Sequence, residues 1–326
     1  MKLKYILTLS TFIFSSALSG KEQSNIAASE IQAVENGLRG SVIFEGDATW
    51  NIAERMQHYG VPGVSLAVIK DFKIHWVKHY GVTDKETGKA VNAKTLFQAG
   101  SISKPVAAYG ALKMVEENQL SLDAPVNKQL QGWQIPENQF TKKQPVTLRY
   151  LLNHSAGLTV HGFGGYPPGE PVPTTIQILN GEAPSNSAAV RVDMQPGTQY
   201  RYSGGGYTVL QKLVADVSNK KYPKIMDDLV LSPLKMTQST YLQPLPPKLI
   251  KYAAAGYLPN KEPVPGKRHT YPEMAAAGLW TTAEDLAKFA IDIQLGVKNG
   301  KSQILSQAMV SEMLTPYVSD LSLIHI

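Results

Sequence analysis

A serine and a lysine stand three residues apart, Ser101 and Lys104, directly before a helical run over residues 106–115. Positions i and i+3 of a helix share a face, so both side chains can point into one cleft. A serine hydroxyl needs a nearby base to become a nucleophile, and a lysine with a lowered pKa can supply that base. The pair therefore predicts nucleophilic chemistry, although a helix cap beside a solvated lysine is the simpler alternative, because serine caps are common.

The same spacing occurs twice more, at Ser218/Lys221 and at Ser232/Lys235. The first of these lies at a polar helix end, and the second contains Pro233, which indicates a break between helices. Only Ser101 follows a mostly apolar run and opens an apolar helix. A nucleophile at a helix N-terminus also gains from the local positive dipole. Context therefore selects Ser101 as the candidate nucleophile.

A tyrosine on a glycine-rich turn forms the second part of the candidate site. Tyr202 lies in the segment YRYSGGGY over residues 200–207, which precedes another helical run. Glycine lets a backbone bend without obstruction, so such a turn can approach a substrate closely. A tyrosine oxygen held by a lysine ammonium can move protons between nucleophile and leaving group. The alternative is a turn with ordinary aromatic packing.

Four stretches in this order resemble the penicillin-recognising serine hydrolases, the family of class C β-lactamases, D-alanyl-D-alanine carboxypeptidases and related esterases. They are FQAGSISKP at 97–105, LLNHSAGL at 151–158, YRYSGGGY at 200–207 and AAAGLWTT at 275–282. The resemblance runs from about Ala48 to about Pro316. It implies Ser101 as nucleophile, Lys104 as its partner and Tyr202 as the second proton carrier. Which group activates the serine is disputed in a neighbouring class, so the roles are assigned jointly.

The resemblance also implies the fold, an α/β (α+β) architecture of the β-lactamase/transpeptidase type. An antiparallel sheet is flanked by helices, a helical domain is inserted, and the active site lies in the seam. Residues 64–69 and 73–82 carry β-branched residues in partial alternation and predict the first hairpin of that sheet, turning at Asp71-Phe72. Further helices are expected over 50–59, 206–217, 222–231, 286–295 and 308–314, with Thr147, a Thr281/Glu284 capping box and Ser306 as start signals.

Two departures from the family pattern bear on the substrate. The family's tyrosine motif is usually Tyr-x-Asn, and Gly204 stands where the asparagine amide would help orient the substrate's acyl part. This favours an ester or a D-amino-acid peptide over a β-lactam, unless Ser203 or a loop supplies the missing group. The family also carries Lys or His, a small residue and Gly on a late strand. The nearest match, at 298–300, indicates a polar turn instead.

The chain end suggests truncation. The last six residues, LSLIHI at 321–326, resemble the translation of a sequencing adapter. We therefore expect the hydrolase domain, residues 48–320, to be incomplete at its C-terminus and to lack its last sheet strands, with 321–326 as a non-native tail. A natural apolar terminal strand is the alternative.

A long loop over residues 159–174 is expected to border the cleft. Four glycines and four prolines fall within these sixteen residues, which predicts a loop without regular structure. Long loops of this kind in compact domains are often functional. Tyr166, Phe163 and His161 are the candidate substrate contacts on it, with an ordinary surface connector as the alternative.

The N-terminus resembles a secretory signal peptide over residues 1–19, followed by an extension over 20–47. Lys2 and Lys4 precede a largely apolar run from Tyr5 to Leu18, which is too short for a comfortable membrane span. The chain contains no cysteine, which leaves neither a lipid-anchor site nor a disulfide. A periplasmic or extracellular protein without a membrane span after cleavage is predicted, with an uncleaved anchor as the alternative.

Composition narrows the classes of function. The 326 residues are 43% hydrophobic and 18% charged, as in folded globular proteins, and the formal net charge is +6. The lysines are scattered, so nucleic acid is a poor partner. His75 and His79 share a strand face but lie roughly 13 Å apart, too far to share one metal ion. We expect neither a metal nor a cofactor, and a small ester, peptide or β-lactam as partner; the oligomeric state stays open.

Two competing functions remain. A Ser-His-Asp hydrolase usually carries a Gly-x-Ser-x-Gly elbow, and none occurs. The best histidine candidate, His154, is instead interpreted as structural, bonded to backbone near Gly157. A catalytically inactive penicillin-binding-like protein that only binds or senses a substrate is the non-enzymatic alternative, because a fold does not fix a function.

Overall fold

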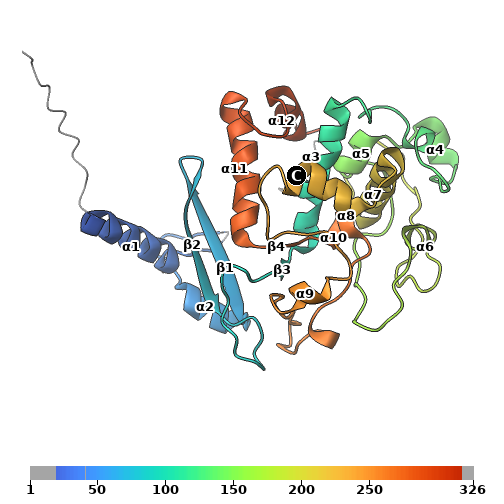
Figure 1. Cartoon of the computed structure of the whole chain (residues 1–326). Helices are drawn as coiled ribbons and strands as arrows, with labels where there is room; N and C mark the ends of the chain where they lie inside the picture. The colour runs from blue at the N-terminus through green and yellow to red at the C-terminus, as the bar shows by residue number, and fades with distance from the viewer. Residues whose placement is uncertain (1–19, 41, 318–326) are drawn as a thin grey trace, which may run out of the picture. The chain divides into compact units, whose positions relative to one another are not determined.

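A computed structural model describes residues 20–40 and 42–317 (Figure 1). The predicted signal peptide and the predicted non-native tail both lie outside these residues. The chain divides into two compact units between Gly60 and Val61. In the first unit α1 spans Gly20–Asn36 and α2 spans Ile52–Tyr59. Asn51 caps α2 in a capping box with Glu54, and Gly60 ends it in the left-handed conformation, as expected for a C-cap glycine.

In the second unit a hairpin comes first and confirms the prediction for residues 64–82. Strand β1 (Gly63–Lys70) pairs antiparallel with β2 (Lys73–Gly81). Both turn residues, Asp71 and Phe72, have positive φ angles of 53° and 60°, as a two-residue type I′ turn requires. Helix α11 (Ala283–Asn299) packs against the hairpin, as Figure 1 shows.

A second, very short sheet leads into the candidate nucleophile. Strand β3 (Phe97–Gln98) pairs antiparallel with β4 (Trp280–Thr281), so that Gln98 lies opposite Trp280. The chain leaves β3 and enters a 3-10 turn at Gly100–Ile102, followed at once by α3 (Ser103–Glu116). The expected mixed fold with antiparallel strands and helices is thus present.

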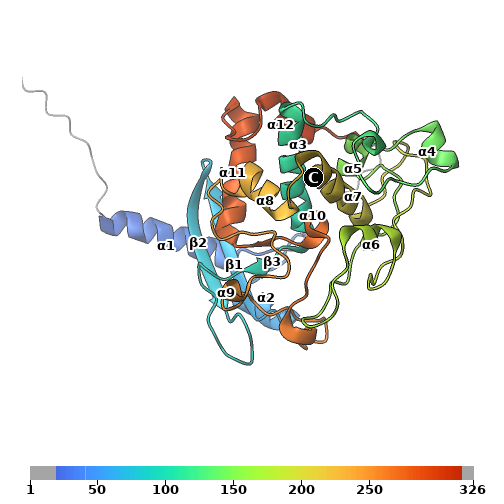
Figure 2. The same ribbon diagram turned by 45° about the vertical axis from the view of Figure 1, so that its right-hand side comes forward.

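Helix α3 is the central element of the core. Eleven of its fourteen residues are buried, among them Val106, Tyr109 and Met114. In both Figure 1 and Figure 2, α3 lies between α11 and α7 (Gly204–Ser218). It also contacts α10 (Met274–Ala277). A helix buried on nearly all sides gives the residues at its start a fixed frame.

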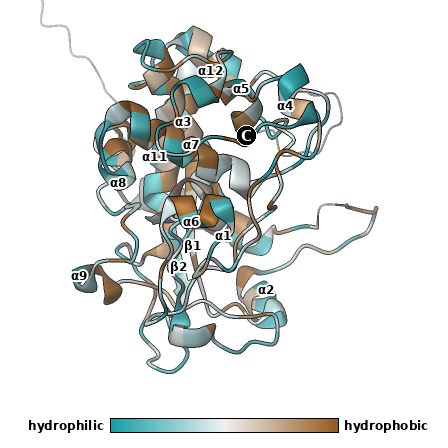
Figure 3. Cartoon of the chain, turned by 90° about the vertical axis from the view of Figure 1, so that its right-hand side faces the viewer, coloured by the Kyte–Doolittle hydropathy of each residue, from teal (hydrophilic) through white to brown (hydrophobic). Residues whose placement is uncertain are grey.

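The remaining helices are short and surround this core. Their bounds are α4 Gln139–Lys143, α5 Leu148–Leu152, α6 Thr175–Asn180, α8 Tyr222–Met226, α9 Pro247–Ile250 and α12 Gln307–Met313, with single turns at Val126–Lys128, Asp227–Leu231 and Pro265–Lys267. Figure 3 shows α4 mostly in the hydrophilic colour, as its sequence QFTKK implies. Thr147 and Ser306 cap α5 and α12 as predicted.

One predicted start signal is wrong by one residue. Thr282, not Thr281, caps α11, and its side chain accepts a hydrogen bond from the N–H of Asp285. Thr281 is held in β4 instead, where it pairs with Phe97. The helix runs on to Asn299 and ends at Gly300 in the left-handed conformation, so residues 298–300 form a helix end.

The loop over residues 159–174 contains no helix or strand, which confirms its prediction. Single β-bridges join Leu158, just before the loop, to Val192 and Tyr166, in its middle, to Thr270. Among the described helices, none combines the length and the apolar character that crossing a bilayer demands.

Candidate active site

Ser101 lies in the middle of the 3-10 turn between β3 and α3, and it is exposed. The turn is possible because Gly100 before it takes a positive φ of 52°. The backbone around it is anchored, since the N–H of Ala99 donates to the carbonyl of Leu279 at 2.9 Å and the N–H of Leu279 donates to the hydroxyl of Ser103 at 2.9 Å. An exposed hydroxyl therefore stands on a rigid support.

Lys104 is buried, with 4% of its surface exposed, at the start of α3. Its Nζ donates to Ser101 Oγ at 3.0 Å and to the carbonyl oxygen of Ala276, on α10, at 2.8 Å. Among the described residues no carboxylate pairs with it. Burial lowers the pKa of Lys104 to about 8, because desolvation disfavours the charged amine. The structure thus brings the predicted serine and lysine together.

Tyr202 completes the predicted trio. It lies just before α7 and is half-buried, and Lys104 Nζ is 4.8 Å from the centroid of its ring. Burial raises the pKa of the Tyr202 hydroxyl above its usual 10, and a hydrogen bond with the Ser101 side chain opposes the shift. The phenol therefore carries its proton at neutral pH, directly beside the Ser101 hydroxyl.

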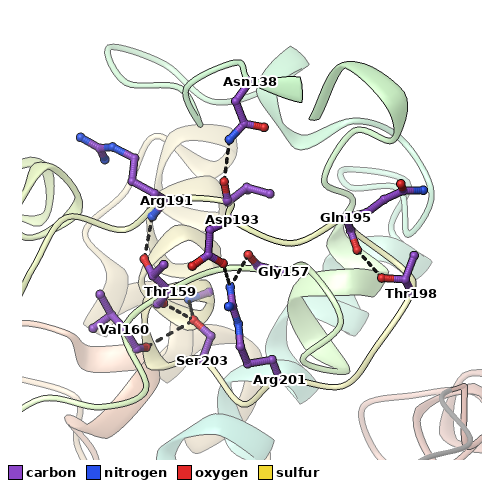
Figure 4. Close-up of polar contacts among 12 residues, drawn as sticks. Asn138, Gly157, Thr159, Val160, Arg191, Asp193, Gln195, Thr198, Arg201 and Ser203 are labelled. Atoms are coloured by element: carbon purple, nitrogen blue, oxygen red, sulfur yellow. Dashed lines mark hydrogen bonds and ion pairs between the residues drawn. The ribbon is translucent and has the colours of Figure 1, made fainter. Parts of the chain in front are cut away.

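Both neighbours of Tyr202 fix the turn in place, as Figure 4 shows. Arg201 forms an ion pair with Asp193 and donates to the carbonyl of Gly157. Ser203 Oγ donates to the carbonyl of Thr159 at 2.7 Å and accepts from the N–H of Gly206 at 2.9 Å, which caps α7. Ser203 is 3% exposed. Its hydroxyl is committed to the turn, so Ser203 does not stand in for an asparagine amide.

His154 also stabilises the turn that carries Tyr202. Its Nδ1 accepts the N–H of Ser203 at 3.1 Å, and its ring lies 4.3 Å from the Tyr202 ring. Burial, with the nearby charge of Lys104, lowers the pKa of His154 to about 3. The interpretation of a histidine bonded to backbone is confirmed, but the partner is Ser203 and not the backbone near Gly157.

Of the predicted substrate contacts, Gly204 and Phe163 lie against each other. A Cβ placed on Gly204 would meet Phe163 Cε2 at 3.0 Å and the carbonyl oxygen of His161 at 3.1 Å. Tyr166 is different. It is 2% exposed, and its hydroxyl accepts the N–H of Asn186 at 3.0 Å. The structure does not bring Tyr166 to a surface that a substrate could touch; it holds the loop instead.

Comparison with known proteins identifies the family. The family model described as Beta-lactamase matches residues 50–321.

The chain belongs to the beta-lactamase family.

Among curated relatives of this family, a "Beta-lactamase" of Lysobacter lactamgenus is 31% identical over 252 residues, which are 75% of this chain and 58% of the relative. "Penicillin-binding protein 4" of Amycolatopsis lactamdurans is 27% identical over 273 residues, 80% of this chain and 67% of that protein. The chain thus spans between about half and two thirds of the length of the curated relatives it matches.

Two solved structures of this family share the fold. One is the octameric penicillin-binding protein homologue from Pyrococcus abyssi, with a TM-score of 0.65 and 28% identity over 82% of this chain and 59% of that one. The other is the D-alanine carboxypeptidase AmpC from Burkholderia cenocepacia, with a TM-score of 0.62 and 26% identity over 81% of this chain and 67% of that one.

Two parts of the site escaped the sequence analysis. The carbonyl of Ala276 holds Lys104, and Tyr207 lies fully buried with its ring centroid 5.7 Å from Lys104 Nζ and its hydroxyl donating to the carbonyl of Leu152. The position of the Ala276 carbonyl cannot be identified from the sequence. Tyr207, in contrast, lies in the YRYSGGGY segment and could have been named as a candidate. Within residues 20–40 and 42–317 no cluster of three metal-binding side chains occurs.

Proposed function

We propose that the protein is a serine hydrolase that forms an acyl-enzyme on Ser101 with an ester or amide carbonyl. One observation carries this proposal. A buried lysine amine, which no carboxylate of the described residues neutralises and whose pKa is lowered, is hydrogen-bonded to the hydroxyl of an exposed serine. A serine that serves only as a helix cap needs no such partner, and an exposed lysine would keep its usual pKa.

The geometry divides the roles of the two proton carriers. With a pKa of about 8, roughly a tenth of Lys104 is neutral at pH 7 and can take the proton of Ser101. Tyr202 keeps its own proton, since its pKa is raised. Ser101 Oγ attacks the carbonyl as its proton passes to Lys104. The leaving group then takes a proton from the Tyr202 hydroxyl, which Lys104 restores. Water later releases the acyl group by the reverse path.

The substrate class follows from the family and from Gly204. The names Beta-lactamase and D-alanine carboxypeptidase, carried by family members reported above, support a β-lactam or a D-amino-acid peptide as substrate. An ester is a further candidate, because it presents a carbonyl that the same serine could attack. Gly204 offers no side-chain amide. We favour an ester or a D-amino-acid peptide. The basic and apolar pattern of residues 1–19 supports action in the periplasm or outside the cell.

The test is covalent labelling. A fluorophosphonate probe and a fluorescent β-lactam are added to the purified protein, and the labelled residue is found by mass spectrometry, with p-nitrophenyl ester hydrolysis followed in parallel. Label on Ser101, together with turnover that Ser101→Ala abolishes, is expected. Label without turnover would favour the inactive binding or sensor protein. Label that persists in Ser101→Ala would remove Ser101 from its role.

A further inference from the structure

The His161 imidazole is an unused polar group at the edge of the site. Its ring centroid lies 4.8 Å from that of Tyr202, and the side chain is exposed. Across the described residues, no hydrogen bond reaches the ring of His161. A neutral imidazole has one donor and one acceptor to offer. The position is therefore next to a proton carrier, open to solvent and chemically free.

The glycine turn is what lets His161 come so close. The N–H of Gly204 donates to the carbonyl of His161 at 3.0 Å, and the N–H of Gly205 donates to the carbonyl of Val160 at 3.0 Å. The contacts of a Cβ on Gly204, given above, are tighter than ordinary packing, and a Cβ on Gly205 would clash with the Thr159 carbonyl oxygen at 2.8 Å. The loop backbone thus occupies the space that side chains would fill.

The backbone before His161 is strained. Val160 has a φ of 63°, in the left-handed region that a β-branched residue rarely adopts. Such conformations are energetically unfavourable and persist only where the surroundings enforce them. Here the two hydrogen bonds from the glycine turn enforce it, and the bend directs the chain so that His161 follows beside Tyr202.

The far side of the loop is held as well. The Nδ1 of His269 donates to the carbonyl of Gly164 at 2.8 Å, and Asn186 Nδ2 donates to the carbonyl of Gly165 at 2.9 Å. Tyr166 and Thr270 exchange backbone hydrogen bonds at 2.9 and 2.8 Å. His161 and Phe163 thus lie on a short segment that hydrogen bonds fix at both ends, so their side chains are held in a defined position.

We propose that His161 is a specificity-determining residue that hydrogen-bonds a polar group on the acyl part of the substrate. The preferred substrate is an ester or amide whose acyl part carries an amide close to the reacting carbonyl, as in an N-acylated amino acid, with Phe163 beside it as an apolar contact. The inference rests on the proposed function, because it assumes that Ser101 reacts with that carbonyl.

The experiment compares two p-nitrophenyl esters of matched length, the N-acetylglycine ester and the pentanoate, which has two methylenes in place of the amide. In His161→Ala, kcat/KM for the N-acetylglycine ester is expected to fall about tenfold, the loss of one hydrogen bond, while pentanoate changes less than about twofold. His161→Gln keeps a donor and an acceptor and should restore part of the loss. His58→Ala, an exposed histidine on α2, is the control and should change neither.

Each other result has a distinct meaning. An equal loss on both esters, or no loss on either, would overturn the inference while Ser101 still forms an acyl-enzyme. Absence of both labelling and turnover in the unmodified protein would overturn the proposed function and this inference with it. A thermal unfolding curve for His161→Ala separates an unfolded variant from a specific loss, and His161→Gln repeats the test without removing the side chain.

Discussion

The Nδ1 of His154 accepts the backbone N–H of Ser203 across 49 positions of sequence. Since Nδ1 is the acceptor, the proton of the neutral ring sits on Nε2. The bond joins the LLNHSAGL segment to the tyrosine turn, and His154 itself is in the left-handed region with a φ of 60°. Two of the segments that carry the family resemblance are therefore one structural unit, which holds the half-buried Tyr202.

Replacing His154 by Ala should weaken this unit without altering the titration of the site. The Ser203 N–H loses its acceptor and a cavity opens beside Tyr202, at a cost of about 2 to 3 kcal/mol in the free energy of unfolding. The value of kcat/KM should fall, while the pKa seen in its pH profile stays the same. Denaturant unfolding and ester kinetics from pH 6 to 9 measure both. A profile that loses its pH dependence would instead make His154 the base.

The pH profile of the unmodified protein should follow Lys104. The neutral amine is the reactive form, so kcat/KM for an ester should rise with pH and level off above an apparent pKa of about 8. Lys104→Arg should abolish turnover, because a guanidinium stays charged. Initial rates from pH 6 to 9.5 provide the check. A rate already constant from pH 6 upward would show that Lys104 is not the base.

The buried carboxyl group of Glu273 should make the free energy of unfolding depend on pH. The side chain is 0% exposed, and neither carboxylate oxygen has a hydrogen-bond partner among the described residues. Burial raises its pKa from the usual 4.5 to about 7. Between pH 4.5 and pH 7, Glu273 is deprotonated in the unfolded chain but still largely protonated in the folded protein. Stability should therefore fall as pH rises from about 4.5 to about 7, by up to about 3 kcal/mol.

Glu273→Gln should remove this component. Urea unfolding at pH 5 and at pH 8 gives the difference in the free energy of unfolding, which should shrink in the variant by about that amount. The Gln side chain keeps the shape and has no charge to bury. An unchanged difference between the two pH values would assign the pH dependence to other groups.

Gly157 contacts the tyrosine turn through its carbonyl, which accepts a hydrogen bond from Arg201, and Gly132 provides a matched control for it. Both have positive φ, 66° and 68°, but a Cβ on Gly157 would meet the carbonyl oxygen of Met194 at 2.1 Å, whereas nothing lies within 4 Å of one on Gly132. Gly132→Ala should cost about 1 to 2 kcal/mol from the angle alone. Gly157→Ala should cost more by at least about 2 kcal/mol and should lower activity, because the Gly157 carbonyl binds Arg201. Equal costs would contradict the clash.

Local patterns were enough for the hairpin, several helix caps and the serine–lysine pair, because neighbouring residues determine each of them. The Thr281/Glu284 box failed for a reason that lies elsewhere in the chain. Thr282 and Asp285 fit the same pattern, and the choice is made by β4, where Thr281 pairs with Phe97 and its hydroxyl bonds Ser239. Local spacing carries no information about such a partner.

The same limit explains the long loop. Its glycines and prolines predict irregular structure, but they do not indicate which side chains face inward. Tyr166 is buried because it pairs with Thr270 and accepts from Asn186, whereas His161 and Phe163 are placed by the turn at Gly204. These contacts join segments far apart in sequence. Composition alone therefore could not distinguish a residue that borders the cleft from one that is buried.

The anchor of Lys104 on the Ala276 carbonyl bears on how this site can change over generations. A backbone oxygen is supplied by the path of α10 and not by the identity of residue 276, so no single codon change there deletes it. Burial of Ala276, 1% exposed, restricts the position to small side chains. Substitutions in this segment are therefore limited by side-chain size and by helix geometry. One of the two hydrogen bonds of Lys104, the bond to the carbonyl of residue 276, is kept whichever small residue stands there.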